Sequence, residues 1–123
     1  MPHVINLSTA WESPDAAAGR VAWTRRFGMP AGIEPGDRVW LVIEAATGCD
    51  LALDGERLPA AAAGRLSRHD ITGRLGLRNE LVLIPEVAVA PDPAVRPAHG
   101  RLPLPPAIGS VRLEIEPRAG GRG

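Results

Sequence analysis

Hydrophobic and polar residues alternate along much of this chain, which is the two-residue period of a β-strand and not the 3.6-residue period of a helix. Four runs show this alternation: residues 21–27, 39–44, 81–84 and 111–116. In the last run, the apolar Val111, Leu113 and Ile115 alternate with charged residues. This pattern predicts a strand that buries one face and leaves the other face in water.

Turn-forming residues separate the runs at short intervals. Asp54-Gly55 stands between two short apolar stretches and predicts a hairpin, because both central residues of a type I′ turn need positive φ. Pro35-Gly36-Asp37 precedes a strand, and Gly73 and Gly76 bracket another turn. Short strands at this spacing predict an all-β sandwich or barrel.

Little of the chain is predicted to be helical. Ser13 as N-cap and Pro14 at the first helical position predict a short helix over residues 13–18, which Gly19 ends. The alanines at 60–63 carry no apolar stripe, and we expect them to form a loop or a single helical turn.

The C-terminal third of the chain is rich in proline. Residues 91–106 contain six prolines. Proline cannot donate a hydrogen bond to a sheet, so we predict a long connection across one end of the sandwich, with Arg101-Leu102 as a brief edge strand. We expect one β-sandwich domain over residues 1–117 and a flexible tail over residues 118–123.

Five short phrases occur in an order that indicates a family. They are Trp23–Phe27, Arg38–Glu44, Leu51–Gly55, His69–Leu75 and Asn79–Leu83. Together they resemble the galactose-binding-domain-like β-sandwich, best known as the N-terminal sugar-binding domain of family-two glycoside hydrolases. The resemblance implies an all-β, antiparallel jelly-roll β-sandwich of about eight strands. It also implies a binding or scaffolding role, because the catalytic carboxylates of that family belong to a separate barrel domain.

Three positions depart from the family pattern. Asp54 replaces the usual hairpin Asn, a change that a type I′ turn tolerates. His69 replaces the usual Phe and brings a polar ring to a normally apolar position. Thr47-Gly48 stands where the family often has an Asp–aromatic pair that faces neighbouring domains.

The charges of the chain are balanced. Lys+Arg and Asp+Glu are both 14 among 123 residues, so the formal net charge is zero. This balance provides no overall attraction to nucleic acid or to acidic membranes. All the basic residues are Arg, and Lys and Tyr are absent, which excludes Schiff-base and P-loop lysine chemistry and phenolic catalysis. We expect no cofactor.

Cys49 is the only cysteine, so neither an internal disulfide nor a thiolate zinc cluster can form. Its apolar neighbours predict a buried, unreactive thiol. Residues 1–7 lack a cationic segment followed by an apolar core, so we expect no signal peptide. No apolar stretch approaches membrane-spanning length. We therefore expect a cytoplasmic protein with no membrane partner.

Three tryptophans and one phenylalanine are the whole aromatic content, and a sandwich so poor in aromatic rings is expected to use them in its core. The alternation places Trp23 and Phe27 there. Trp40 lies opposite the apolar residues of its strand, so buried and exposed positions are equally open. Trp11 is the best candidate for an exposed sugar-stacking ring, although packing is favoured even there.

One pair of neighbouring residues suits acid–base chemistry. His69-Asp70 could transfer protons, but no Ser or Cys partner is identifiable in the sequence. We favour the alternative, in which Asp70 caps the turn that begins at Ile71-Thr72.

Acidic residues offer two further candidates. The group in residues 50–56 could hold calcium, but the hairpin already explains Asp54 and calcium needs about six or more oxygens, so we expect no metal site. Glu44 and Glu114 could form a carboxylate pair. Glutamates on strand faces more often pair with arginine, for which the arginines at 25–26 are available.

The densest basic segment holds Arg65, Arg68, Arg74 and Arg78. Aromatic residues on which bases could stack are missing around it, although proteins that bind single strands generally need them. We predict a solvated basic edge and no nucleic-acid partner.

The sequence favours a non-catalytic binding or assembly module whose ligand is either a carbohydrate or a protein partner. Its candidate ligand-binding residues are Trp11, Trp40, His69 and Asp70. An apolar outer face would favour a homo-oligomer, which would also cover edge strands. The alternative is a small hydrolase or enzyme subunit using His69 and Asp70, which requires His69 to be exposed in a concavity.

Overall fold

The computed structural model describes residues 3–15 and 21–117 of the chain, without the side chains of residues 13–15. Ten strands lie in these residues: β1 (His3–Asn6), β2 (Trp11–Asp15), β3 (Ala22–Gly28), β4 (Arg38–Ala45), β5 (Cys49–Leu53), β6 (Glu56–Ala61), β7 (Arg65–Asp70), β8 (Arg78–Pro85), β9 (Arg101–Leu102) and β10 (Gly109–Glu116). The all-β class expected from the sequence is confirmed, with more strands than expected.

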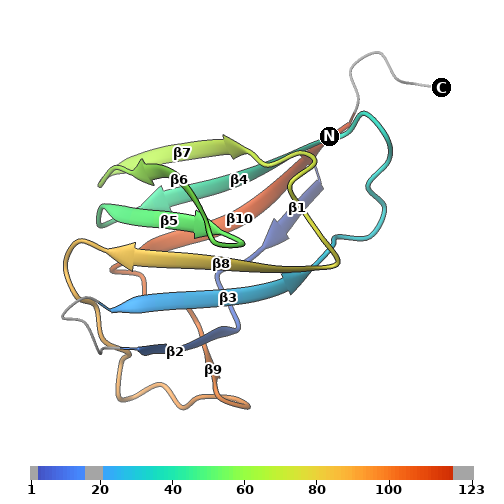
Figure 1. Cartoon of the computed structure of the whole chain (residues 1–123). Coiled ribbons are helices and arrows are strands. Elements are labelled where there is room, and N and C mark those ends of the chain that lie inside the picture. Colours follow the sequence, from blue (N-terminus) through green and yellow to red (C-terminus); the bar gives the residue numbers. More distant parts are fainter. Residues whose placement is uncertain (1–2, 16–20, 118–123) are drawn as a thin grey trace.

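The strands form two antiparallel sheets that face each other as a sandwich (Figure 1). The four-stranded sheet has the order β1-β10-β4-β7, and the six-stranded sheet has the order β6-β5-β8-β3-β2-β9. The chain changes sheets six times: after β1, β3, β4, β6, β7 and β9. These crossings bring segments that are far apart in the sequence into one core. The jelly-roll type stays a prediction.

The strand faces predicted by the alternation are confirmed in the four-stranded sheet. Ile43 of β4 pairs with Val111 of β10, and Leu41 pairs with Leu113. All four side chains are buried. Burial of each such aliphatic side chain stabilises the fold by about 1.5–3 kcal/mol, so the β4–β10 pair supplies a large part of the core.

The six-stranded sheet contributes Trp23 and Leu83, which pair across β3 and β8 and are fully buried. Phe27 on the same face is half-buried and packs at the margin of the core. Opposite Phe27, the buried Asn79 side chain accepts a hydrogen bond from the Gly76 amide (2.8 Å) and donates one to the Gly76 carbonyl (3.1 Å). The predicted core position is thus confirmed for Trp23 and holds in part for Phe27.

The helix predicted to start at Ser13 is wrong over the described residues, because residues 11–15 form strand β2. The rest of that predicted helix falls in residues 16–20, which lie outside the described part of the chain. β2 pairs with β3 on one side and with β9 on the other. Two sheet partners outweigh the weak helical preference of a few residues.

The alanine run also differs from its prediction, since β6 continues as a strand through Ala61. Pro59 lies inside this strand, which is possible because β6 is at the edge of its sheet. The neighbouring hairpin is as predicted: Asp54 and Gly55 have φ of 51° and 82°, as a type I′ turn requires. The Asp54 side chain accepts a hydrogen bond from the Glu80 amide at 2.7 Å, which explains its role without a metal.

Residues 91–106, which we call the proline strap, run along one edge of the sandwich beside β2 and β9, as the orange segment of Figure 1 shows. Arg101-Leu102 is the edge strand that the sequence predicted, and Leu102 pairs with Trp11. The Leu104 amide donates a hydrogen bond to the Ser8 carbonyl (2.8 Å). The strap is therefore tied to the strand ends beneath it.

No helix in the described residues is long and apolar enough to cross a membrane. The tail predicted over residues 118–123 lies outside the described residues.

Candidate functional site

The three tryptophans differ in their exposure. Trp11 and Trp23 are both fully buried (0% exposed). Their indole N–H groups donate to backbone carbonyls, Trp11 to Leu7 at 2.7 Å and Trp23 to Val89 at 3.2 Å. Neither ring is exposed to solvent. Trp11 is therefore a packed core residue and not an exposed sugar-stacking ring. Trp40 is half-buried and points outward from the four-stranded sheet.

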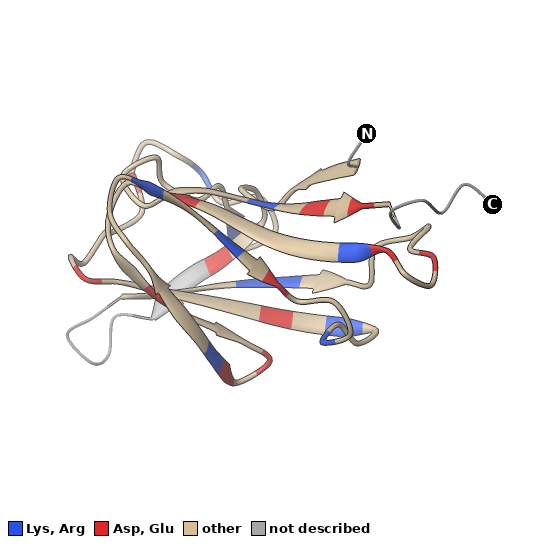
Figure 2. Cartoon of the chain, turned by 90° about the horizontal axis from the view of Figure 1, so that it is seen from above, with Lys and Arg blue, Asp and Glu red and all other residues tan. Residues whose placement is uncertain are grey.

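Trp40 belongs to a row of outward-pointing side chains on three adjacent strands, which we call the Trp40 face. Its members are Trp40, Val42 and Glu44 of β4, Arg112 and Glu114 of β10, and Arg68 of β7. The strand register places Glu114 directly beside Trp40, and places Val42 between Arg112 and Arg68. Charged residues of both signs also occur along strands of both sheets (Figure 2).

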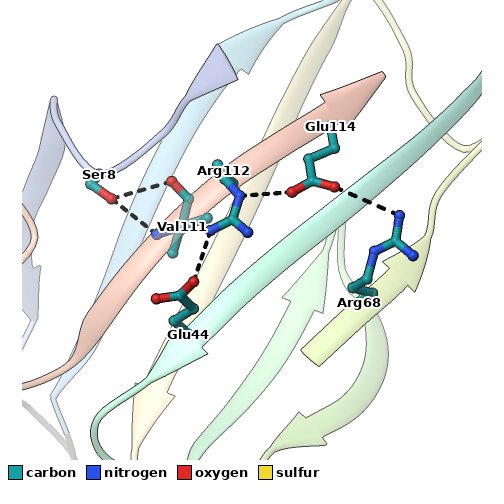
Figure 3. Close-up of polar contacts among 6 residues, drawn as sticks. All are labelled: Ser8, Glu44, Arg68, Val111, Arg112 and Glu114. Atoms are coloured by element: carbon teal, nitrogen blue, oxygen red, sulfur yellow. Dashed lines mark hydrogen bonds and ion pairs between the residues drawn. The ribbon is translucent and has the colours of Figure 1, made fainter. Parts of the chain in front are cut away.

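Arginines and glutamates on the Trp40 face form a continuous chain of ion pairs (Figure 3). Arg112 Nε lies 2.8 Å from Glu114, and Arg112 Nη1 lies 3.2 Å from Glu44. Arg68 approaches the other oxygen of Glu114 at 3.6 Å. The hydrogen bond to Glu114 raises the pKa of Arg112 above its ordinary value. The short Arg112–Glu114 pair holds these two planar side chains in place over the sheet.

The two glutamates therefore do not form a carboxylate pair, because Arg112 lies between them. The predicted preference for arginine partners is confirmed, but the partners are Arg112 and Arg68. Arg26, one of the arginines expected there, instead pairs with Glu12 and Glu80 on the other sheet. The alternation of residues 111–116 predicts that Arg112 points into solvent. Only the register of β10 against β4 shows that Glu44 is within its reach.

The arginines of the Trp40 face cover apolar surface as well as pairing charges. Val42 points outward yet is fully buried (0% exposed), because the long side chains of the flanking arginines cover it. The Arg68 guanidinium stacks on the Trp40 ring, 4.3 Å from its centroid. Trp40 Nε1 is buried and has no hydrogen-bond partner among the described residues. The ring is thus an aromatic surface closed by one arginine.

His69 and Asp70 lie on opposite faces of β7. His69 pairs with Leu41 and faces the core side of the sheet, while Asp70 pairs with Trp40 on the outer side. His69 Nε2 is buried and has no hydrogen-bond partner in the described part of the chain, and burial lowers the pKa of this imidazole. The two residues cannot share a proton, so the geometry does not support joint acid–base chemistry.

Asp70 instead holds the turn that follows β7, as the favoured alternative predicted. Its carboxylate accepts a hydrogen bond from the Thr72 amide (3.0 Å) and one from Arg38 (2.8 Å). The hydrogen bonds from Thr72, and then that from Arg38, hold its pKa below the ordinary value. Asp70 also borders Trp40 in the register, so it lies at the rim of the Trp40 face.

We predict that lowering the pH from 7.5 to 5 destabilises the protein through His69. Its folded-state pKa is lowered, so the unfolded chain binds more protons once the pH falls below about 6.5. This contribution to stability is present above that pH and is lost as the pH falls through it toward the folded-state pKa. His69→Phe should flatten the plot of Tm against pH over this interval.

Asp70 does not affect the measurement between pH 7.5 and 5. Its pKa is lowered from 3.8, so its contribution to stability is lost only below that interval. A wild-type Tm that stays constant between pH 7.5 and 5 would contradict the burial of His69 Nε2.

The proline strap encloses an apolar hollow of about 250 Å³ against the sandwich. Its walls include Trp23, Pro91, Val95, Leu104 and Pro105, and Asp92 is the one charged residue among its lining residues. Sugars need several placed hydrogen-bonding groups, so this hollow suits a carbohydrate poorly. The described residues contain no group of His, Cys, Asp and Glu placed to hold a metal ion, and Cys49 is buried as predicted.

The fold defines the chain as a β-sandwich of the type found as a domain in family-two glycoside hydrolases. Neither a protein-family model nor a curated protein sequence matches it. Among solved structures, it is similar to the β-glucuronidase of Bifidobacterium dentium, with 24% identity, 80% of this chain covered and a TM-score of 0.55. The FMN-binding β-glucuronidase from Facaelibacterium prausnitzii L2-6 gives 19% identity, 95% coverage and a TM-score of 0.63.

The β-D-glucuronidase of Dictyoglomus thermophilum is a third such structure, with 14% identity over 95% of this chain and a TM-score of 0.62. The matched part is only 21%, 23% and 28% of the lengths of these three enzymes. The likeness confirms the resemblance expected from the sequence at the level of the fold. It covers one domain of much longer chains.

Proposed function

We propose that this chain is a non-catalytic carbohydrate-binding module and that the Trp40 face is its ligand surface. The observation that carries the proposal is the position of Trp40. It is the tryptophan that is not fully buried, and it lies among fixed, planar charged groups on a sheet face. A sugar offers an apolar ring face to an aromatic side chain and hydroxyl groups to carboxylates and guanidinium groups.

Binding requires that Arg68 leave the Trp40 ring, and this displacement costs little. An exposed cation–π contact contributes about 0.5–1 kcal/mol. The Arg68–Glu114 pair is long at 3.6 Å, and exposed pairs of this kind contribute about 0–1 kcal/mol. Arg112 and Glu114 stay in place because they are held at 2.8 Å. Arg68 is thus the movable cover of an otherwise rigid surface.

The experiment is a glycan-array screen followed by titration calorimetry with the best glycan. Wild type should bind, and Trp40→Ala should weaken binding by about tenfold or more, the loss expected for one aromatic contact. Arg68→Ala should bind as tightly as wild type or more tightly, because it removes the cover. Arg57→Ala, on the other sheet, should leave the affinity unchanged.

Two outcomes would contradict the proposal. Glycan binding that Trp40→Ala leaves intact would exclude the Trp40 face. A blank array would exclude the carbohydrate ligand.

An assembly module is the second candidate, and the rim of the Trp40 face favours it. Val4 pairs with Glu114 on one side of the face and Leu66 pairs with Glu44 on the other. Both are exposed, at 53% and 50%. Exposed aliphatic side chains at the border of this face suit coverage by a protein partner or a second copy of the chain. Sedimentation of the wild type at several concentrations tests self-association, and Leu66→Asp should abolish it.

A further inference from the structure

A second hollow lies at the edge of the six-stranded sheet, on the other sheet from the Trp40 face. It measures about 550 Å³ and is open to solvent. Its walls include Thr9 and Ala10 before β2, Arg96, His99 and Arg101 of the proline strap, and Pro103 after β9. We call it the strap hollow. Its lining residues come from the edge of the sandwich where β9 pairs with β2, and Figure 1 shows this edge.

The charged residues that line the strap hollow are all basic. Two arginines and one histidine line it, and none of its lining residues is acidic. Among the described residues, no carboxylate forms an ion pair with Arg96 or Arg101, whereas Arg112 and Arg26 each have two such partners. In a chain with equal numbers of acidic and basic residues, this uncompensated positive charge is local.

Two neighbouring charged groups strengthen this conclusion. Glu12 stands opposite Arg101 in the β2–β9 register, but its carboxylate is 3.0 Å from Arg26. Arg25 lies close enough to be affected by Arg101: burial, and after it the like charge of Arg101, lowers the pKa of Arg25. Arg101 therefore has a cationic neighbour and no carboxylate of its own.

The backbone that carries the basic residues is ordered before any ligand arrives. Ala98 and Arg101 exchange two backbone hydrogen bonds of 2.9 Å. His99 and Gly100 between them have φ of 53° and 75°, so the segment is a two-residue type I′ hairpin. Ala10 on the opposite wall has φ of 61°, a left-handed conformation that alanine rarely adopts. A site built on fixed backbone loses little entropy on binding.

We propose that the strap hollow binds an oxyanion, namely a carboxylate, phosphate or sulfate group carried by a ligand or free in solution. Arginine suits this role because its planar guanidinium donates paired hydrogen bonds to two oxygens of one such group. Arg101 supplies one guanidinium group from the second arm of the hairpin, and Arg96 supplies another from two residues before its first arm. The site uses none of the residues of the Trp40 face, so it can be tested independently of the carbohydrate proposal.

The test is a two-dimensional NMR titration of the ¹⁵N-labelled chain with sodium phosphate, sodium sulfate, sodium glucuronate and, as the neutral control, glucose. The three anions should shift the amide signals of residues 9–10 and 96–103, and glucose should not. Raising NaCl from 50 to 500 mM should weaken binding, because salt screens exposed charges. Equal affinities would identify a general oxyanion site, and much tighter glucuronate binding would identify an acidic sugar as the ligand.

Arg96→Gln and Arg101→Gln should each weaken anion binding about tenfold, the change expected when one charged hydrogen-bonding group is lost. Neither variant should change Tm, because neither side chain has a hydrogen bond or ion pair within the described residues. Arg78→Gln removes an exposed arginine outside the hollow and serves as the matched control.

Absence of shifts up to 50 mM anion would overturn the proposal, and so would shifts that both hollow variants retain in full. Trp40→Ala should bind anions as wild type does. This variant therefore separates failure of the anion site from failure of the carbohydrate proposal.

Discussion

Trp11→Ala is expected to lower the free energy of unfolding by about 3–5 kcal/mol, the range for removal of a buried large aromatic side chain. Trp11 is 0% exposed and packs in the core between the sheets. Its indole N–H also satisfies the Leu7 carbonyl at 2.7 Å, which the alanine variant leaves without this donor. Urea unfolding of wild type and variant at 25 °C measures the difference.

Trp11→Phe is the matched control, because it keeps most of the ring and removes only the N–H donor. Its free energy of unfolding should fall by about 1–3 kcal/mol, which is less than the fall for the alanine variant. It also keeps the experiment informative if the alanine variant fails to fold. A loss below about 1 kcal/mol for Trp11→Ala would mean that the ring lies at the surface, and would revive Trp11 as a sugar-stacking residue.

Gly109→Ala is the second change with a large expected effect. Gly109 opens β10 opposite Ala45 and has φ of 133°, a conformation that residues with a side chain rarely adopt. An added Cβ would lie 2.0 Å from the Glu44 carbonyl oxygen, which is backbone and cannot move aside freely. Backbone strain costs about 1–3 kcal/mol, and overpacking costs about 1–3 kcal/mol more.

The control for Gly109 is Gly64→Ala, because Gly64 also has positive φ (72°) but has open space where a Cβ would stand. It should cost about 1–2 kcal/mol, the price of a left-handed alanine alone. Urea unfolding measures both variants. If the free energy of unfolding falls by the same amount in both variants, β10 does not approach β4 as closely at Gly109 as the structure shows.

The strand faces were predictable because they follow a local rule. Leu41 and Leu113 lie on the buried faces that the alternation predicted, since successive side chains on a strand point to opposite sides. The Asp54-Gly55 hairpin was predictable for the same kind of reason: its φ values are a property of the residues themselves. The helix predicted over residues 13–18 is wrong over its described residues, 13–15, where a local preference competed with the two sheet partners of β2.

The candidate site was predictable only in part. Trp40 was named from the sequence, and Asp70 was expected to cap a turn, as it does. The sequence could not show that Arg68 covers the Trp40 ring or that Arg112 separates Glu44 from Glu114, because both depend on the register of neighbouring strands. Val42 also depends on the register: it points outward, yet it is buried between the arginines of two neighbouring strands.

The sequence by itself determined the all-β class, the hairpin at residues 54–55, the edge strand in the proline-rich segment and the likeness in fold to a domain of glycoside hydrolases. These depend on side-chain period, turn chemistry and proline, which act within a few residues. Tertiary structure alone decided that Trp11 is a core residue, that His69 and Asp70 are separated, and that Arg96 and Arg101 line one hollow. These depend on which strands pair and in what register, and that is decided by contacts between residues far apart in the chain.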